Sequence, residues 1–446
     1  MRGNVLKLAL PAVGEQFLNL LVGLVDTFLV GHLALSAARE LGYGSAQALA
    51  AVGLSSYVVW AATTLFIAVA VAATALIARA TGAKNPEEAQ SALRQSLLLG
   101  AMMGLLALVV IRIFAGPILR LLGAPPDVYP LGVAFLRITA LSMPLAGLLF
   151  IGNAALRGAG DTRTPLLVMF VVNGLNMLVA WVLVNGRWGF PMLGVEGTAL
   201  GAAIGRSAGG LLVIAMLIRG RGHLKLDRLP RPNPTMLKRL VRVGLPSGGE
   251  QLAFQGALML FARLVTGLGT VAFAAHNTVL MIESISFLPG LGFAAAATTL
   301  VGQGLGAEDA QQARWNGNEA FRQAVIFMAI MGLAFVVVPQ WFLSLLVDDP
   351  QVIAAGVVPL RTVGLIQPLL AASFVFSGAL RGAGDTRFPL WIKLISPWLL
   401  RLPLALLLIP WLGLTGAWIA LSSDLALQGL LSWWRFRGSR WEHIQL

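Results

Sequence analysis

The chain has 446 residues, of which 57% are hydrophobic and only 11% are charged, and its mean hydropathy is +0.81. A soluble domain carries about 25% charged residues, so this composition excludes a soluble globular protein and requires the bilayer as solvent. The net charge of +13 would suggest nucleic acid as a partner of a soluble protein. Here the basic residues lie between hydrophobic stretches and act as topology signals, so we expect no nucleic-acid binding. The absence of cysteine excludes thiolate metal sites and cysteine nucleophiles.

Hydrophobic stretches long enough to cross about 30 Å of hydrocarbon predict an all-α integral membrane protein with twelve transmembrane helices. They cover residues 7–32, 49–77, 93–114, 130–155, 164–186, 194–218, 238–267, 273–302, 320–343, 352–377, 389–411 and 413–434. Lys and Arg concentrate in the segments that are cytoplasmic when both ends are inside. We therefore expect a multi-pass protein of the cell inner (plasma) membrane with both termini in the cytoplasm.

The first stretch contains an acidic residue, Asp26, about two-thirds of the way along. A carboxylate in hydrocarbon is costly unless it is paired, hydrated or neutralised, which makes it a functional candidate. Glu15, Asn19 and Val22 share its helical face, so this face is partly polar and should point into the protein. The alternative is a neutral aspartic acid that only ties helices together by a hydrogen bond.

Three later stretches of the same half carry polar residues that could surround Asp26. Asn173 and Asn176 lie one turn apart on the fifth stretch, Asn153 lies near the end of the fourth, and Thr198 near the start of the sixth. Each by itself is equally consistent with an interhelical hydrogen bond worth about 0.6 kcal/mol. Together with Asp26 they predict a cation- or proton-binding site.

The sequence is internally duplicated. ALRGAGDTRTPL at residues 155–166 recurs as ALRGAGDTRFPL at residues 379–390 and differs at one position. This predicts two pseudo-symmetric six-helix bundles related as parallel repeats, which can rock against each other to give alternating access. The predicted domains are an N-terminal lobe at 1–218, a cytoplasmic linker at 219–237 and a C-terminal lobe at 238–446.

The duplicated loops predict tight turns, because glycine tolerates the backbone conformations that a turn needs. Asp161 and Asp385 can cap the helix that follows each turn. Neither loop carries the Gly-Lys-Ser/Thr signature of a phosphate-binding loop, so we exclude ATP-driven transport by this chain alone. Glu15 and Glu250 recur near the cytoplasmic ends of the two halves, which suits pairing or capping, although substrate contact at an inner gate stays open.

The C-terminal half contains two secondary buried candidates, Glu283 in the eighth stretch and Asp424 in the twelfth. A buried carboxylate is stabilised by a buried cation. We therefore expect each to pair with a cation such as Arg263, Arg361 or Arg401 in preference to moving an ion.

Three motifs together resemble the multidrug and toxic compound extrusion (MATE) transporters, and in particular their DinF-like branch. They are LVDTFLVGHL at the end of the first stretch, the doubled RGAGDTR, and FLPGLGFAAAATTLVGQGLGA at residues 287–307. The resemblance covers essentially the whole chain. It implies a V-shaped pair of six-helix lobes that exports organic, often cationic or amphipathic compounds in exchange for protons or sodium ions. It also implies a monomer that is not an enzyme, with the lipid bilayer and small organic molecules as partners and no cofactor beyond the coupling ion.

The resemblance further implies that Asp26 is the family's cation-site aspartate, with Asn153, Asn176 and Thr198 among the polar residues around it. The chain departs from the family at Ala180, where members often have a second aspartate. Sodium requires about five or six oxygen ligands, whereas a proton needs only the carboxylate, so we favour proton coupling, with sodium at Asp26 as the alternative. The tenth stretch contains no Asp or Glu, so the C-lobe cation site of NorM-type members is missing.

Two other functions compete with export. A lipid-linked saccharide flippase of the same superfamily usually needs a more cationic central cavity than the few arginines within the spans provide. An intramembrane enzyme would need a histidine cluster, paired acids at metal spacing or a nucleophile elbow, which the sequence lacks. The predicted function is therefore an ion-coupled multidrug antiporter, with the flippase as the alternative.

Overall fold

The computed structural model describes residues 2–32, 40–221, 223–227 and 231–444. Apart from loops and an isolated β-bridge between Arg221 and Leu224, these residues are helical. They form two compact units. We call Gly14–Ile77 together with Pro86–Val241 the N-terminal unit, and Met1–Val13 together with Ala78–Asn85 and Arg242–Leu446 the C-terminal unit.

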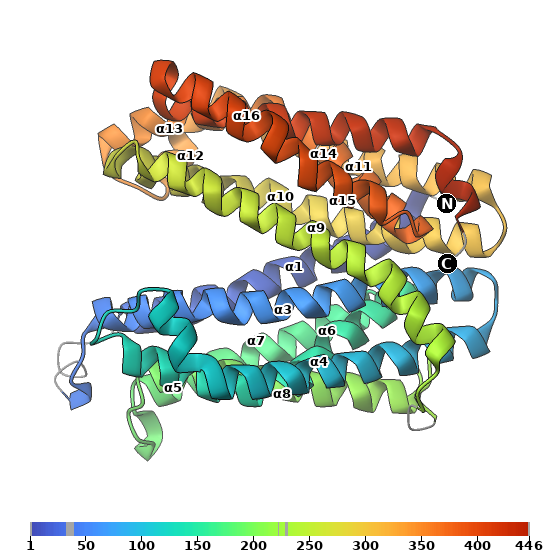
Figure 1. Cartoon of the computed structure of the whole chain (residues 1–446), viewed down its shortest axis with the longest axis horizontal. Coiled ribbons are helices and arrows are strands. Elements are labelled where there is room, and N and C mark those ends of the chain that lie inside the picture. Colours follow the sequence, from blue (N-terminus) through green and yellow to red (C-terminus); the bar gives the residue numbers. More distant parts are fainter. Residues whose placement is uncertain (1, 33–39, 222, 228–230, 445–446) are drawn as a thin grey trace. The chain divides into compact units, whose positions relative to one another are not determined.

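The N-terminal unit is a bundle of long helices that run along its length (Figure 1). α7 packs along α8, and α4 packs against α6. The helices of this half of the chain are α1 (Arg2–Gly31), α3 (Ser45–Gly82), α4 (Pro86–Leu121), α5 (Tyr129–Leu141), α6 (Met143–Gly158), α7 (Arg163–Val184), the short η1 (Arg187–Gly189) and α8 (Val195–Arg219).

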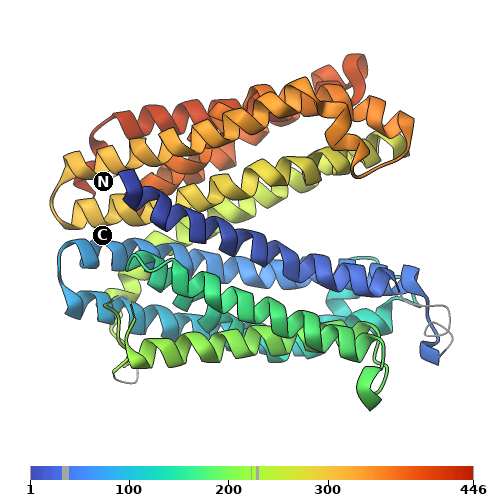
Figure 2. The same ribbon diagram turned by 180° about the vertical axis from the view of Figure 1, so that it is seen from behind.

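The C-terminal unit is a second helical bundle, seen from behind in Figure 2. α10 packs against both α11 and α14, and α14 packs against α16. The helices of this half are α9 (Pro234–Thr266), α10 (Thr270–Gly306), α11 (Ala310–Val337), α12 (Pro339–Ser344), α13 (Pro350–Leu365), α14 (Gln367–Ala383), α15 (Arg387–Ser396), η2 (Pro397–Arg401), α16 (Leu402–Arg437) and η3 (Arg440–His443).

The helices account for each predicted span. Within the described residues, 8 helices are long and apolar enough to cross a membrane, or up to 10 when each of two bent pairs counts as one span. The remaining two predicted spans correspond to α9, which is less apolar, and to a division of Arg387–Arg437 at Gly413, whose positive φ of 56° breaks α16. The all-α transmembrane prediction is confirmed.

Two predicted spans are bent, which the hydropathy pattern did not indicate. The pair α5 and α6 turns by 55°, and the pair α13 and α14 turns by 54°. Each second helix has a proline, Pro144 or Pro368, in its first turn. Proline has no N–H to donate and its ring clashes with the preceding turn, so a helix breaks before it.

A row of glycines brings α8 unusually close to α7. A Cβ placed on Gly205 would lie 2.7 Å from the carbonyl oxygen of Val172, and one placed on Gly201 would lie 2.8 Å from the Cβ of Ala180. Both glycines lie on one face of α8, since they are four residues apart. Small residues permit this close approach of helices in a membrane. The packing fixes the position of α7, and therefore of Asn176, relative to α8.

The C-terminal unit also includes two segments from the first half of the chain. Ala78–Asn85, between α3 and α4, belongs to the C-terminal unit, as does the beginning of α1. Within that unit Arg79 donates a hydrogen bond of 2.7 Å to the carbonyl of Ile444, and Gly82 lies directly against the backbone of Gln303.

Candidate functional site

Asp26 is a buried acid held by one side-chain hydrogen bond. Its side chain is only 5% exposed, and the Nδ2 of Asn176 on α7 donates to its Oδ1 at a long distance of 3.4 Å. The other polar atom of Asn176, Oδ1, is buried without a hydrogen-bond partner in the described structure. α1 and α7 therefore bring together a carboxylate and an amide that has acceptor capacity left, as a cation or proton site requires.

Arg206 on α8 is the charged neighbour of this pair. It interacts electrostatically with Asp26, but no ion pair between the two occurs among the described residues, and its Nη1 is buried without a hydrogen-bond partner. Arg206 follows Gly205, which packs on Asn176. From the sequence we predicted no role for Arg206 beside Asp26, although it is one of the few arginines within the spans. The signal that could have indicated Arg206 is its place next to a glycine of the α7–α8 interface.

The structure does not bring the other predicted ligands to Asp26 through hydrogen bonds. Asn173 donates to the carbonyls of Leu18 and Met169, both at 2.9 Å, so its amide ties α7 to α1 at a different level. The hydroxyl of Thr198 donates to the carbonyl of Val195 in its own helix. The Oδ1 of Asn153 is buried without a partner among the described residues. The part of these residues in ion binding stays a prediction.

The recurring glutamates Glu15 and Glu250 form ion pairs with the arginines of the duplicated motif. Glu15 pairs with Arg157 at 2.5 Å, and Glu250 pairs with Arg381 at 2.8 Å. Glu250 has a second partner, Lys393, at 3.0 Å. The repeated positions therefore carry out the same structural pairing in both halves, with one additional cation in the C-terminal half.

The two duplicated loops have the same turn conformation, but their aspartates have different partners. Gly160 and Gly384 both have φ of 90°, in the left-handed region that favours glycine. Asp161 accepts hydrogen bonds from the backbone N–H and the hydroxyl of Thr164, at 3.0 and 2.6 Å, and so caps α7. Asp385 instead pairs with Arg435 at 2.7 Å. The predicted capping therefore holds for the first loop, whereas the second forms an ion pair.

In the C-terminal half, Asp424 is fully neutralised. Arg401 binds it with Nη2 at 2.6 Å, and both side chains are completely buried. Gln428 donates to the same carboxylate at 3.1 Å, and Ser396 donates to its other oxygen. Arg401 is one of the cations that the sequence analysis named as partners.

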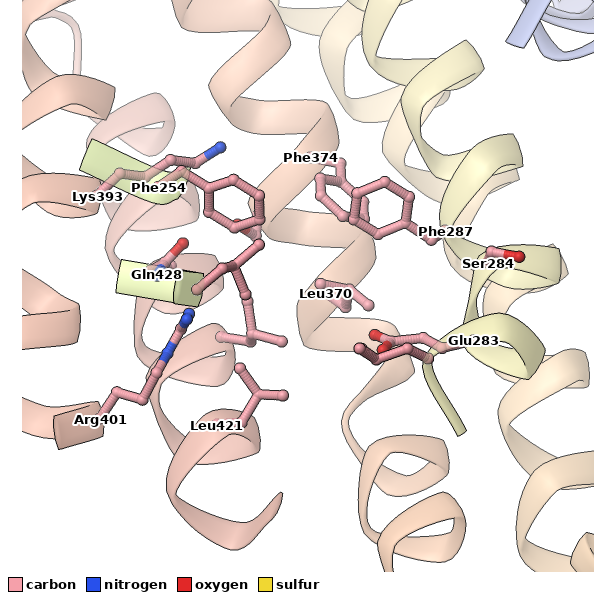
Figure 3. Close-up of a pocket in the computed structure, with 14 residues that line it drawn as sticks. Phe254, Glu283, Ser284, Phe287, Leu370, Phe374, Lys393, Arg401, Leu421 and Gln428 are labelled. Carbon is pink, nitrogen blue, oxygen red and sulfur yellow. The ribbon is translucent and has the colours of Figure 1, made fainter. Parts of the chain in front are cut away.

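Glu283 has a different environment, because it lines a cavity of about 240 Å³ in the C-terminal unit. Figure 3 shows its side chain on one side of this cavity and those of Arg401 and Lys393 on the other. Glu283 is 6% exposed and interacts electrostatically with Arg401. Among the described residues, however, no ion pair or hydrogen bond holds its carboxylate.

Comparison with known protein families identifies the family of this chain. The MatE family model matches residues 11–182 and 246–407, which covers most of both halves. The chain belongs to the MatE family. The predicted resemblance to MATE transporters is thereby confirmed, and the protein is a transporter and not an enzyme.

Three relatives of this MATE protein match over nearly their full length. The probable multidrug resistance protein NorM of Thermotoga maritima is 31% identical over 99% of this chain and 93% of its own. The protein of the same name from Rhodopseudomonas palustris is 30% identical over 97% of this chain and 91% of its own. The uncharacterised transporter YisQ of Bacillus subtilis is 25% identical over 98% of this chain and 94% of its own.

Solved structures show that the fold is that of MATE transporters. A crystal structure of MATE in the bent conformation superposes with a TM-score of 0.88 and 22% identity, over 97% of this chain and 94% of that chain. A MOP superfamily transporter from Pyrococcus furiosus, whose binding pocket is described as having reverse polarity, superposes with a TM-score of 0.86 and 21% identity over 98% of this chain and 95% of its own. The twelve-helix membrane fold predicted from the sequence is confirmed.

Proposed function

We propose that this MATE protein is a proton-coupled antiporter that exports small amphipathic or cationic organic compounds across the plasma membrane by alternating access. Membership of the family supports transport, and the geometry of Asp26 supports the coupling. The observation that carries the proposal is a carboxylate that is 5% exposed, held by a single long hydrogen bond and free of any ion pair in the described structure. Such a group can gain and lose a cation without first breaking a buried salt bridge.

The surroundings of Asp26 favour a proton over sodium as the coupling ion. Arg206 already places a positive charge near the carboxylate, and a bound sodium ion would be repelled by it at low effective dielectric. A proton meets the same field from Arg206, but it needs only the carboxylate as its partner, whereas a sodium ion needs about five or six oxygen ligands. Ala180 adds no second acid, and its Cβ is in contact range of Gly201, so a larger side chain has little room there.

In this mechanism Asp26 exchanges between a protonated and an ionised form, and Asn176 responds to the change. The N–H of Asn176 donates to the ionised carboxylate, whereas its free Oδ1 can accept the hydrogen of the protonated acid after the amide turns over. The glycine contacts of α8 hold α7 in place during this exchange. Substrate and proton then compete for one state of the transporter, which is the basis of antiport.

The test is gradient-driven export from proteoliposomes that contain the full chain. An imposed pH gradient should drive export of an ethidium-like dye by the wild type, whereas Asp26→Asn should bind the dye but lose at least about 90% of the driven export, since an amide cannot be ionised. Glu196→Gln makes the same chemical change at an exposed residue and should export normally. Full activity of Asp26→Asn would remove Asp26 from the mechanism.

A sodium gradient at equal pH on both sides identifies the coupling ion. We expect no export under this condition. Export driven by sodium, with none driven by the pH gradient, would contradict proton coupling and would assign sodium to Asp26. Lipid-linked saccharides assayed in the same vesicles should not be moved, which separates an exporter from a flippase.

A further inference from the structure

The cavity in the C-terminal unit has mainly apolar walls with charged groups on two opposite sides. Phe254, Phe287 and Phe374 contribute rings to its lining, and the rings of Phe287 and Phe374 form an edge-to-face pair with centroids 4.7 Å apart. Aromatic walls of this kind favour a flat aromatic ligand, which stacks on one ring and meets the edge of another. The volume of about 240 Å³ suits a molecule no larger than a single aromatic amino acid.

The acidic side of the cavity is formed by Glu283 of α10 (Figure 3). A carboxylate that is 6% exposed and has no hydrogen bond or ion pair among the described residues is a costly group to bury. An ammonium group that entered the cavity would supply the missing partner. The carboxylate of Asp424 needs no ligand ammonium, because it already has an ion pair with Arg401 and hydrogen bonds from Gln428 and Ser396.

The basic side is formed by Lys393 and Arg401, which still have donors to offer. Lys393 shares the single carboxylate of Glu250 with Arg381. One negative charge therefore compensates only half of the positive charge of Lys393 and Arg381. Arg401 binds Asp424 through Nε and Nη2, and its Nη1 is buried without a hydrogen-bond partner. A ligand carboxylate on this side would meet an ammonium and a guanidinium N–H.

We propose that this cavity is a binding site for small aromatic zwitterions, with the ligand ammonium at Glu283 and the ligand carboxylate at Lys393 and Arg401. Opposed charges on the walls select a ligand with opposed charges, because either charge alone would leave one wall uncompensated. As a substrate site the cavity rests on the proposed function, but the binding itself does not depend on coupling to protons.

The experiment compares three ligands with the same ring system. Tryptophan carries both charges, tryptamine only the ammonium, and indole-3-propionate only the carboxylate. Binding of each is measured by isothermal titration calorimetry on the purified full chain, without any gradient. Tryptophan should bind at least about tenfold more tightly than either analogue. Tighter binding of tryptamine would show a plain cation site, tighter binding of indole-3-propionate an anion site, and absence of binding by all three an unused cavity, and each of these outcomes overturns the proposal.

Variants assign the two ends of the ligand. Glu283→Gln should lower the affinity for tryptophan and tryptamine at least about tenfold and leave the affinity for indole-3-propionate undiminished. Lys393→Met should lower the affinity for tryptophan and indole-3-propionate but not for tryptamine. Glu283→Asp keeps the charge and should retain most of the tryptophan affinity, which separates loss of charge from misfolding. Glu196→Gln should bind all three ligands as the wild type does. Equal effects of Glu283→Gln on all three ligands would overturn the assignment.

The binding and transport assays can reject the two proposals separately. If tryptophan binds as described but export ignores the pH gradient, the proposed coupling is wrong and the binding site stands. If the dye is exported in response to the gradient but tryptophan does not bind, the binding site is wrong and the proposed function stands.

Discussion

Asp26 in the first half of the chain and Asp424 in the second are both buried acids, but they lie on different helices and in opposite electrostatic states. Glu15 and Glu250 occupy matching positions and form matching ion pairs, and counting eleven residues on from each places Phe261 where the first half has Asp26. The C-terminal half instead has Asp424, far along the chain on α16. Its acid is neutralised by a buried arginine, whereas Asp26 has no ion pair in the described structure.

The last helices of the two halves can be aligned, and the alignment shows which residue of the first half corresponds to Asp424. Leu193-Gly194 precedes α8 as Leu412-Gly413 precedes the second part of α16, and both glycines have positive φ, of 51° and 56°. In this register Gly205 corresponds to Asp424. In the first half the glycine lets α8 approach Asn176. In the second half the carboxylate at that place reaches Arg401, whose guanidinium also lies over the ring of Phe261 at 6.0 Å.

Asp26 and Asp424 therefore suit two different roles, exchange of a cation and stabilisation of the packing. A fully paired acid in a low-dielectric interior fixes the packing of its half, because moving either charge would leave the other uncompensated. An acid without an ion pair is free to exchange its cation, which coupling requires. The first half therefore holds an exchangeable acid that is hydrogen-bonded to Asn176. The second half holds a permanent ion pair and, facing a ligand-sized cavity, Glu283, which has no ion pair among the described residues.

The largest effect is expected when each of the two acids is neutralised in turn. Asp424→Asn leaves Arg401 buried without a counter-charge and should destabilise the protein by about 3–5 kcal/mol. Asp26→Asn removes no ion pair, keeps a hydrogen-bonding group and should cost less than about 1 kcal/mol. Thermal unfolding of the purified variants under identical conditions measures the difference. Equal midpoints for the two variants would show that the halves do not differ in this respect.

A smaller effect is expected where the glycine contacts position Asn176. Gly205→Ala adds a Cβ that would lie 2.7 Å from the carbonyl of Val172, and such overpacking costs about 1–3 kcal/mol. It should also reduce proton-driven export, since α7 and Asn176 are displaced. Gly174→Ala is the matched control, because a Cβ at Gly174 meets no atom within 4 Å, and it should leave stability and export unchanged. The same unfolding and proteoliposome assays apply.

The smallest effect concerns the single difference between the duplicated motifs, Thr164 in the first and Phe388 in the second. Thr164→Val removes the hydroxyl that donates to Asp161 but keeps the backbone donor, so it should cost about 1 kcal/mol of unfolding free energy. Phe388→Leu should leave the ion pair of Asp385 with Arg435 intact and lose the contacts of the ring with Arg435 and Trp434. An unchanged free energy of unfolding for Thr164→Val would contradict the capping role of Asp161 in the first loop.

Much of the architecture was predictable from local patterns. Hydropathy runs located each span, although α11 begins ten residues before the predicted 320 and α4 extends seven residues beyond each end of the predicted 93–114. The duplicated motif identified the two halves and their matching turns. The bends at Pro144 and Pro368 were also within reach, since proline in the middle of a span interrupts the helix. The beginning of α1 and Ala78–Asn85 nevertheless belong to the C-terminal unit, because compactness depends on contacts between residues distant in sequence.

The class of protein and the choice of Asp26 as a buried acid were predictable from the amino-acid sequence, because both follow from the cost of moving polar groups into hydrocarbon. The duplication was predictable from the repeated motif. Which charges pair could be seen only once the helices were packed together. Asp424 finds Arg401, Glu250 takes both Arg381 and Lys393, and Glu283 is left facing a cavity. The physical reason is that an ion pair depends on a few ångströms of separation between helices and on their rotation about their axes, and neither quantity is contained in the hydropathy of a single helix.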